Sequence, residues 1–146
     1  MDKKIIGRKD VVDFPSIGLN NVQVKIDSGA FSSSIHCEKI SERTQTGNNF
    51  LEVVFLDQYD DSYTGEEIRF ENYKKRIIKS SNGVSEERFI VELEILLFSQ
   101  SYRSEFSLTR RNDLKFPVLL GRKLLNKRFI IDTSKSNLSF KAKIKK

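Results

Sequence analysis

One long run of alternating charged and apolar residues limits the fold more than any other part of this chain. It covers residues 87–98 and reads Glu-Arg-Phe-Ile-Val-Glu-Leu-Glu-Ile-Leu-Leu-Phe. Successive side chains of a strand point to opposite faces, whereas the apolar face of a helix recurs every three to four residues, so the pattern favours a strand. Asn82-Gly83 precedes this run and follows a second alternating stretch, residues 74–80. Because Asn-Gly is typical of two-residue turns, we predict a β-hairpin here.

Similar strand patterns recur along the whole chain, separated by turn-forming residues. Only residues 38–43 and 122–126 are predicted as short helical turns, and no internal repeat is evident. We therefore predict an all-β fold, a partly closed barrel, in a single domain over residues 1–146 with a core at about 4–133 and a basic tail at 141–146. The other predicted strands are 4–12, 22–26, 50–56, 68–70, 102–108, 118–120, 129–132 and 138–144.

Composition narrows the setting in which such a domain works. The chain of 146 residues is 38% hydrophobic, which suits one folded domain. It has no apolar run of the ~20 residues needed to cross a bilayer and no signal-peptide core, so a cytoplasmic location and no membrane association are expected. A single cysteine, Cys37, is expected to be buried rather than nucleophilic. The net charge of +6 attracts anions without choosing among nucleic acid, membrane and acidic peptide.

A carboxylate, a hydroxyl and a glycine follow the predicted strand at 22–26. These residues are Asp27, Ser28 and Gly29, followed by Ala30. A loop leaving a strand end is a rigid place for chemistry, and a glycine there lets a backbone or a substrate approach the acid closely. Ordinary turns use the same residue types, so this motif alone does not establish a site.

A second motif, Leu119-Leu120-Gly121-Arg122, follows about ninety residues later. An Asp-Ser/Thr-Gly-Ala after a strand, followed by two aliphatic residues, Gly and Arg, resembles the retropepsin-like aspartic proteases. With residues 4–8 and 129–132, the chain is similar to the bacterial branch labelled ATP-dependent zinc proteases, the RimB-like proteins found with a RimK-type glutamate ligase that acts on a ribosomal protein. The resemblance covers about residues 5–132 and implies a retropepsin-like acid-protease barrel with peptidase activity.

The resemblance also implies how Asp27 would work. Aspartic proteases activate water between two carboxylates that share a proton, and retropepsins bring the two together by dimerising. This chain has one Asp-Ser-Gly, and its nearest echo, Asp132-Thr133-Ser134, lacks the glycine. A homodimer with one Asp27 from each subunit is therefore implied. Ser28 would bond across the two-fold axis, and residues 119–121 would pack beneath the Asp27 loop.

Two departures from the family pattern concern the substrate. Retroviral enzymes place an acid soon after the motif, where it pairs with the arginine, and the bacterial branch has an arginine where this chain has Phe31. Arg122 is therefore available either to hold a ligand or to cap a loop. The association with a glutamate ligase suggests a glutamate-rich peptide tail as the substrate. Candidates for binding its carboxylates, each with a structural role as the alternative, are Arg76, Lys79, Arg88 and Arg122.

Neither half of the branch's label, ATP or zinc, has support in these residues. One histidine, His36, and one cysteine cannot form a His/Cys zinc site within a chain, and no His-Glu-x-x-His or phosphate-binding loop occurs. No metal site and no cofactor are predicted, and His36 is expected to be a surface or hydrogen-bonded side chain.

Two functions remain open, and a third ranks last. The first is an aspartic peptidase with a bell-shaped pH–rate profile centred below neutrality. The alternative is a non-catalytic peptide-binding module on the same fold, which receives a peptide by pairing with a strand edge. The third function is a basic β-barrel that binds RNA. It ranks last, and nucleic acid is not expected as a partner, because no aromatic-rich basic strand of the ribonucleoprotein type occurs.

Overall fold

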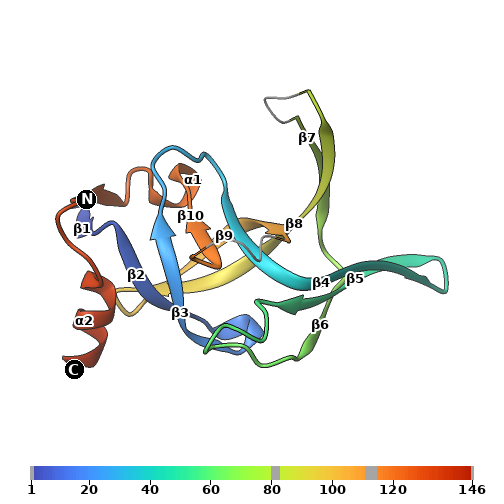
Figure 1. The fold of residues 1–146 in the computed structure, drawn as a ribbon, viewed down its shortest axis with the longest axis horizontal. Coiled ribbons are helices and arrows are strands. Elements are labelled where there is room, and N and C mark those ends of the chain that lie inside the picture. Colours follow the sequence, from blue (N-terminus) through green and yellow to red (C-terminus); the bar gives the residue numbers. More distant parts are fainter. Residues whose placement is uncertain (1, 80–82, 111–114, 146) are drawn as a thin grey trace.

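The computed structural model describes residues 2–79, 83–110 and 115–145, with the backbone alone at 78 and 79. Strands dominate it, as Figure 1 shows. A single 3-10 turn, η1 (Pro15–Ile17), and two helices, α1 (Arg122–Leu125) and α2 (Leu138–Ile144), interrupt them. The strands are β1 (Lys4–Ile6), β2 (Lys9–Phe14), β3 (Leu19–Ile26), β4 (Ser33–Gln45), β5 (Asn48–Phe55), β6 (Glu67–Phe70), β7 (Lys74–Lys79), β8 (Ser85–Leu97), β9 (Gln100–Thr109), β10 (Val118–Leu120) and β11 (Phe129–Ile131).

Six of the strands close into a ring. The pairing runs β10–β3–β2–β8–β9–β4 and returns to β10, because β10 pairs with both β3 and β4. β5 and β6 extend the sheet from β4, β7 extends it from β8, and β1 pairs with β11 in a separate two-stranded parallel sheet. The predicted all-β, partly closed barrel is thus confirmed.

Alternating burial along the strands builds the core inside the ring. In β2 every second residue is buried, and Val22, Val24 and Ile26 continue the pattern in β3. Phe14 and Phe106, both fully buried, meet edge to face with their ring centroids 5.5 Å apart. Cys37 is also fully buried, as expected, and burial raises the pKa of its thiol.

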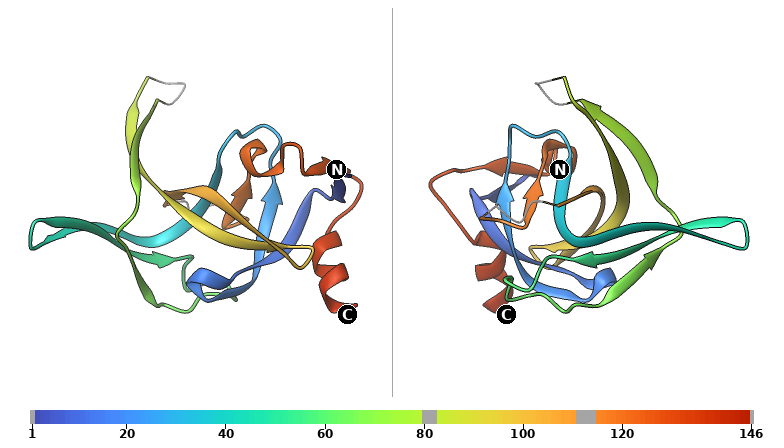
Figure 2. Two further views of the ribbon diagram at one scale, coloured as in Figure 1. Left: turned by 180° about the vertical axis from the view of Figure 1, so that it is seen from behind. Right: turned by 45° about the vertical axis from the view of Figure 1, so that its right-hand side comes forward.

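Two hairpins, β4–β5 and β7–β8, extend away from the ring in different directions (Figures 1 and 2). The first overturns a prediction, because residues 38–43 form part of the long strand β4 instead of a helical turn. Most of these residues are polar because this part of the strand projects beyond the barrel. Residues 39–43 pair with β5 after a register shift between Cys37 and Lys39. Thr46 and Gly47 make the turn with φ of 50° and 81°. The predicted β7–β8 hairpin is formed, although Asn82 of its turn lies outside the described residues.

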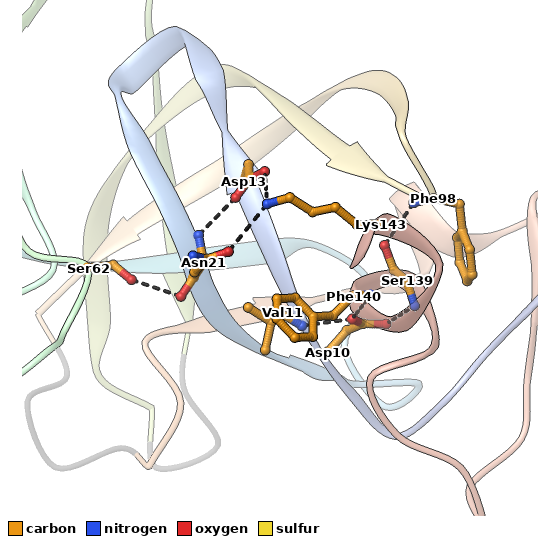
Figure 3. Close-up of polar contacts among 9 residues, drawn as sticks. All are labelled: Asp10, Val11, Asp13, Asn21, Ser62, Phe98, Ser139, Phe140 and Lys143. Atoms are coloured by element: carbon orange, nitrogen blue, oxygen red, sulfur yellow. Dashed lines mark hydrogen bonds and ion pairs between the residues drawn. The ribbon is translucent and has the colours of Figure 1, made fainter. Parts of the chain in front are cut away.

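The C-terminal segment was predicted as a strand at 138–144 and is the helix α2 instead. Its first turn is capped by Asp10, whose side chain is fully buried (Figure 3). Oδ2 accepts the N–H of Ser139 at 2.9 Å, and Oδ1 accepts those of Phe140 at 3.1 Å and Val11 at 2.8 Å. Burial raises the pKa of Asp10, and these hydrogen bonds act in the opposite direction. A carboxylate remote in sequence therefore selects the helix.

Two further contacts fix α2 against the barrel (Figure 3). Ser139 Oγ accepts the N–H of Phe98 at 2.8 Å, and Lys143 Nζ lies 2.7 Å from Asp13 Oδ2. The predicted basic tail is therefore partly a docked helix. None of the described helices is long and apolar enough to cross a membrane.

Candidate active site

The closing strand of the ring, β10, lies between the two strands that flank the Asp27 loop. It runs parallel to β3, with Leu120 opposite Ile26, and antiparallel to β4, with Val118 opposite Ile35. The loop at 27–32 connects β3 to β4 over the end of β10. The two motifs recognised in the sequence are therefore neighbours in space.

The Asp27 loop is held by backbone hydrogen bonds from both motifs. Asp27 N–H donates to Leu120 O at 2.9 Å, and Arg122 N–H donates to Ala30 O at 2.9 Å. Within the loop, Ala30 N–H donates to Asp27 O at 3.2 Å, and Gly29 N–H donates to Asp27 Oδ1 at 3.0 Å. The loop conformation is thus fixed by residues about ninety positions away.

Arg122 takes one of the two roles that the sequence left open. Its Nη1 donates to Ser28 O at 2.9 Å, so the guanidinium caps the loop. Its guanidinium carbon also lies 5.9 Å from the centroid of the Phe31 ring, which is 60% exposed. Lys123 N–H adds a bond to Phe31 O at 2.8 Å. These contacts hold the loop from the α1 side.

Two glycines permit the close approaches in this site. A Cβ on Gly121 would lie 2.7 Å from the carbonyl carbon and oxygen of Ser32, so only glycine fits there. Gly121 N–H donates to Ser33 Oγ at 3.0 Å. A Cβ on Gly29 would lie 3.3 Å from Asp27 Oδ1 and would crowd the carboxylate.

The Asp27 carboxylate is accessible and makes few contacts. Its side chain is partly exposed, and within the described residues its one hydrogen bond comes from Gly29 N–H. Ser28 is exposed, and its hydroxyl has no hydrogen-bond partner in the described part of the chain. The carboxylate and the hydroxyl are therefore available to a ligand or to another protein copy.

The echo motif at Asp132 forms a turn with the same backbone hydrogen bonds. Asp132 N–H donates to Ile6 O at 2.9 Å, and Lys135 N–H donates to Asp132 O at 3.1 Å. Ser134 N–H donates to Asp132 Oδ1 at 3.0 Å, and Arg8 N–H donates to Lys135 O at 2.8 Å. In both places the turn is supported by a parallel strand, β1 or β10, which ends in two aliphatic residues and is followed by Gly and Arg.

This duplication was not predicted, since the sequence showed no internal repeat. The signal was present in the similarity of Ile5-Ile6-Gly7-Arg8 to Leu119-Leu120-Gly121-Arg122, and of Asp132-Thr133 to Asp27-Ser28. A Cβ on Gly7 would lie 2.3 Å from Lys135 O, so this glycine is required for the same reason as Gly121. Similarities of only four residues could not be recognised as a repeat from the sequence, because the shared hydrogen bonds are seen only in the structure.

Two of the three predicted carboxylate-binding residues on β7–β8, Arg76 and Arg88, form ion pairs with glutamates outside the Asp27 loop. Arg76 Nη2 lies 3.5 Å from Glu105 Oε1, and Arg88 Nη2 lies 3.3 Å from Glu86 Oε2. Arg88 Nε is buried without a hydrogen-bond partner among the described residues. The side chain of Lys79 lies outside the described residues. A role in substrate binding stays a prediction for these three residues.

His36 has a carboxylate partner that the sequence did not indicate. Its Nε2 lies 2.9 Å from Asp57 Oδ2, and the ring is buried near the start of β4. Asp60 lies beside this pair, and burial raises its pKa. Within the described residues, no group of three or more His, Cys, Asp or Glu side chains is arranged to hold a metal ion.

Comparisons with known proteins identify the family. The family model described as "Retropepsin-like aspartic endopeptidase RimB" matches residues 5–142. This chain belongs to the RimB-like family. The resemblance found in the sequence is therefore confirmed over nearly the whole chain.

Relatives and a solved structure extend this result. A "Probable alpha-L-glutamate ligase" of Desulfotalea psychrophila is 34% identical over 130 residues, which cover 89% of this chain and 28% of the relative. One of Shewanella pealeana is 30% identical over 135 residues, covering 92% and 30%. The chain thus spans less than a third of these relatives. A Legionella pneumophila protein of unknown function shares the fold, with a TM-score of 0.72, 23% identity and coverage of 94% of this chain and 99% of that one.

Proposed function

We propose that this RimB-like protein is an aspartic peptidase in which Asp27 carboxylates of two copies form the catalytic dyad. The observation that carries the proposal is the Asp27 carboxylate itself, which is rigidly mounted over β10 and has a single internal hydrogen bond among the described residues. One carboxylate cannot act as acid and base at once, so a second copy would supply the other. The exposed Ser28 hydroxyl is suited to bond across the axis between the copies.

In this mechanism a water molecule lies between the two carboxylates. The ionised carboxylate takes a proton from the water while the water oxygen attacks the peptide carbonyl carbon. The protonated carboxyl group gives its proton to the carbonyl oxygen. The resulting tetrahedral intermediate collapses as the carboxyl group protonated by the water gives that proton to the leaving nitrogen. The other carboxylate takes a proton from a hydroxyl group of the intermediate, which restores the singly protonated dyad. Because the dyad titrates as a pair, activity is expected to be bell-shaped in pH, with a maximum below neutrality.

The substrate that we propose is a glutamate-rich peptide. Relatives that include this domain are named for a glutamate ligase, and a peptidase domain would act on acidic chains made by such a ligase. The net charge of +6 favours an acidic substrate. A reducing, cytoplasmic setting fits the single buried Cys37.

The decisive experiment compares Asp27→Asn with Asp132→Asn. We expect the first to lower hydrolysis of a glutamate-rich peptide at least about a thousandfold, as for removal of other catalytic groups, while the second stays within about twofold. Circular dichroism would check that both variants fold. Equal activity of Asp27→Asn and wild type, or a profile that rises to alkaline pH and collapses on chelation, would remove Asp27 from the mechanism.

Mixing wild type with Asp27→Asn tests whether the dyad spans two copies. A mixed pair has one aspartate, so activity should fall with the square of the wild-type fraction once subunits have exchanged. A linear fall would mean that each copy works alone.

A second candidate function is peptide binding without catalysis. One observation favours it, an open groove of about 890 Å³ between β6, η1 and β8. Among the described strands β6 pairs only with β5, so its outer edge faces the groove and can pair with an extended peptide. Binding of a peptide by a monomer that shows no hydrolysis would support this function over the first.

A further inference from the structure

A hollow of about 610 Å³ lies beside the Asp27 loop, where the chain passes through α1. We name it the α1 hollow. Four of the six residues that line it are cations, and none is an acid. The lining residues are Phe31, Arg122, Lys123, Asn126, Lys127 and Arg128.

Three of these cations have no carboxylate partner among the described residues. Arg122 donates to the Ser28 carbonyl, and Arg128 Nη1 donates to Leu124 O at 2.9 Å. The Lys127 side chain makes no hydrogen bond or ion pair with any described residue, and it is exposed. Carbonyl groups do not cancel a full charge, so the hollow attracts anions.

The fourth cation extends the positive region away from the loop. Lys123 Nζ lies 2.6 Å from Glu105 Oε1, and Glu105 also contacts Lys74 at 2.6 Å and Arg76 at 3.5 Å. Lys123 and Lys74 lower the pKa of Glu105 to about 2, so this carboxylate stays ionised. One negative charge cannot neutralise three cations. The positive region therefore continues from the α1 hollow to the base of the β7–β8 hairpin.

Phe31 gives the hollow an apolar wall. Its ring is 60% exposed and lies over the Arg122 guanidinium, and its carbonyl is fixed by Lys123 N–H. A glutamate side chain has two methylene groups that can pack on such a ring while its carboxylate faces the cations. Phe31 is four residues from Asp27, so a peptide lying along the Asp27 loop would place a flanking side chain here.

We propose that the α1 hollow binds the carboxylate side chains of an acidic peptide beside the bond attacked at Asp27. Phe31, Lys127 and Arg128 determine specificity in this subsite, and Arg122 both caps the loop and contributes charge. The inference rests on the proposed peptidase function. A neutral peptide of the same length would bind poorly, because it offers no charge to offset that of the hollow.

The test measures binding in the Asp27→Asn background, where hydrolysis is not expected to interfere. Fluorescein-labelled tetraglutamate is titrated and followed by fluorescence anisotropy at low salt. We expect Lys127→Gln with Arg128→Gln to weaken binding at least about tenfold, and tetraglutamine to bind too weakly to measure. The matched control is Lys141→Gln with Lys145→Gln, which removes the same charge from the C-terminal segment and should change affinity less than about twofold. Thermal melting checks that each variant folds.

Several results would overturn the proposal. They are unchanged tetraglutamate affinity in the Lys127/Arg128 variant, equal binding of tetraglutamine, or equal losses in the variant and its control. Binding of an eight-nucleotide RNA with the same dependence would assign the hollow to nucleic acid, and loss of self-association in the variant would assign it to an interface between copies. Full hydrolytic activity of Asp27→Asn would reject the peptidase function by itself, while the binding data would still report on the hollow.

Discussion

The turns at Asp27 and Asp132 share their backbone hydrogen bonds, and they differ in the groups that surround the carboxylate. In both, the aspartate comes after a strand that pairs in parallel with a neighbour, and Oδ1 accepts the N–H two residues on. At the second turn, however, Ser134 Oγ also donates to Asp132 Oδ1 at 2.6 Å. At the first turn the equivalent residue is Gly29, which has no side chain to donate.

The comparison shows that two separate features matter: how rigidly an aspartate is positioned, and whether its carboxylate is free to bind a ligand. A parallel strand followed by Gly and Arg positions the aspartate rigidly in both turns. In the second turn, however, the hydroxyl of the residue two positions after the aspartate donates a hydrogen bond to its carboxylate. The hydrogen bonds from Ser134 lower the pKa of Asp132, so that group is held as an ionised acceptor. Gly29 therefore has two roles, since it permits the loop and leaves the Asp27 carboxylate open to solvent and ligands.

Among changes that keep both aspartates, the largest expected effect comes from exchanging the residues that distinguish the two turns, Gly29 and Ser134. Gly29→Ser would place a side chain against Asp27 Oδ1, where a Cβ would already lie 3.3 Å away. We expect a loss of peptidase activity of about a hundredfold or more with the protein still folded. The reverse change, Ser134→Gly, should leave activity within about twofold. Retained activity in Gly29→Ser, measured as kcat/KM on a glutamate-rich peptide, would show that the glycine does not distinguish the two turns.

The supporting glycines provide the next test. Gly121→Ala and Gly7→Ala each force a Cβ to within 3 Å of a backbone carbonyl, so each should lower the free energy of unfolding by about 3 kcal/mol or more. The control is Gly47→Ala at the tip of the β4–β5 hairpin, where no atom lies within 4 Å. It should cost only about 1–2 kcal/mol for its φ of 81°. Urea unfolding followed by fluorescence or circular dichroism measures all three, and equal losses would contradict the role of close packing.

Replacing Asp10 tests how much its cap of α2, the helix that follows the second turn, contributes to stability. Asp10→Ala would leave buried N–H groups without an acceptor and remove the helix cap, so we expect a loss of about 2–3 kcal/mol in unfolding free energy. Lys145→Ala at the exposed end of α2 should change it by less than about 0.5 kcal/mol. If the two variants were equally stable, the cap would not anchor this helix.

The smallest expected effect is the pH dependence of the Asp132 turn. Its pKa is lowered in the folded protein, so its contribution to stability is present above the unfolded pKa of 3.8 and is lost as the pH falls through the folded value. Asp132→Asn should therefore melt slightly below wild type at pH 7, and the difference should shrink towards about pH 2. A difference that grew on acidification would mean that the sign of the pKa shift is wrong.

The sequence predicted the parts of this molecule that depend on local patterns. Alternation identified β3, β8 and most of the ring strands. The family resemblance carried by Asp27-Ser28-Gly29 and Leu119-Leu120-Gly121-Arg122 implied that the two motifs would meet. In the structure the association of the motifs rests on hydrogen bonds such as Asp27 N–H to Leu120 O. Whether Asp27 is catalytic remains a prediction.

The errors arose where remote contacts decide the local structure. Residues 138–144 alternate like a strand, yet Asp10, about 130 positions earlier, caps them as a helix. Residues 38–43 are polar because their strand leaves the barrel and pairs with β5 alone. The α1 hollow could not be predicted, because its charge balance depends on which cations Glu105 contacts.

The close packing of Gly7 against Lys135 has a consequence for synthesis on the ribosome. The first strand, β1, finds its partner only in β11, and Asp10 finds the N–H groups it caps only in α2. A nascent chain therefore keeps β1 without its partner strand, and the Asp10 carboxylate without the N–H groups of α2, until residues 129–140 emerge. Long-range pairing of this kind makes folding slow, so the incomplete chain presents unpaired strand edges to its neighbours.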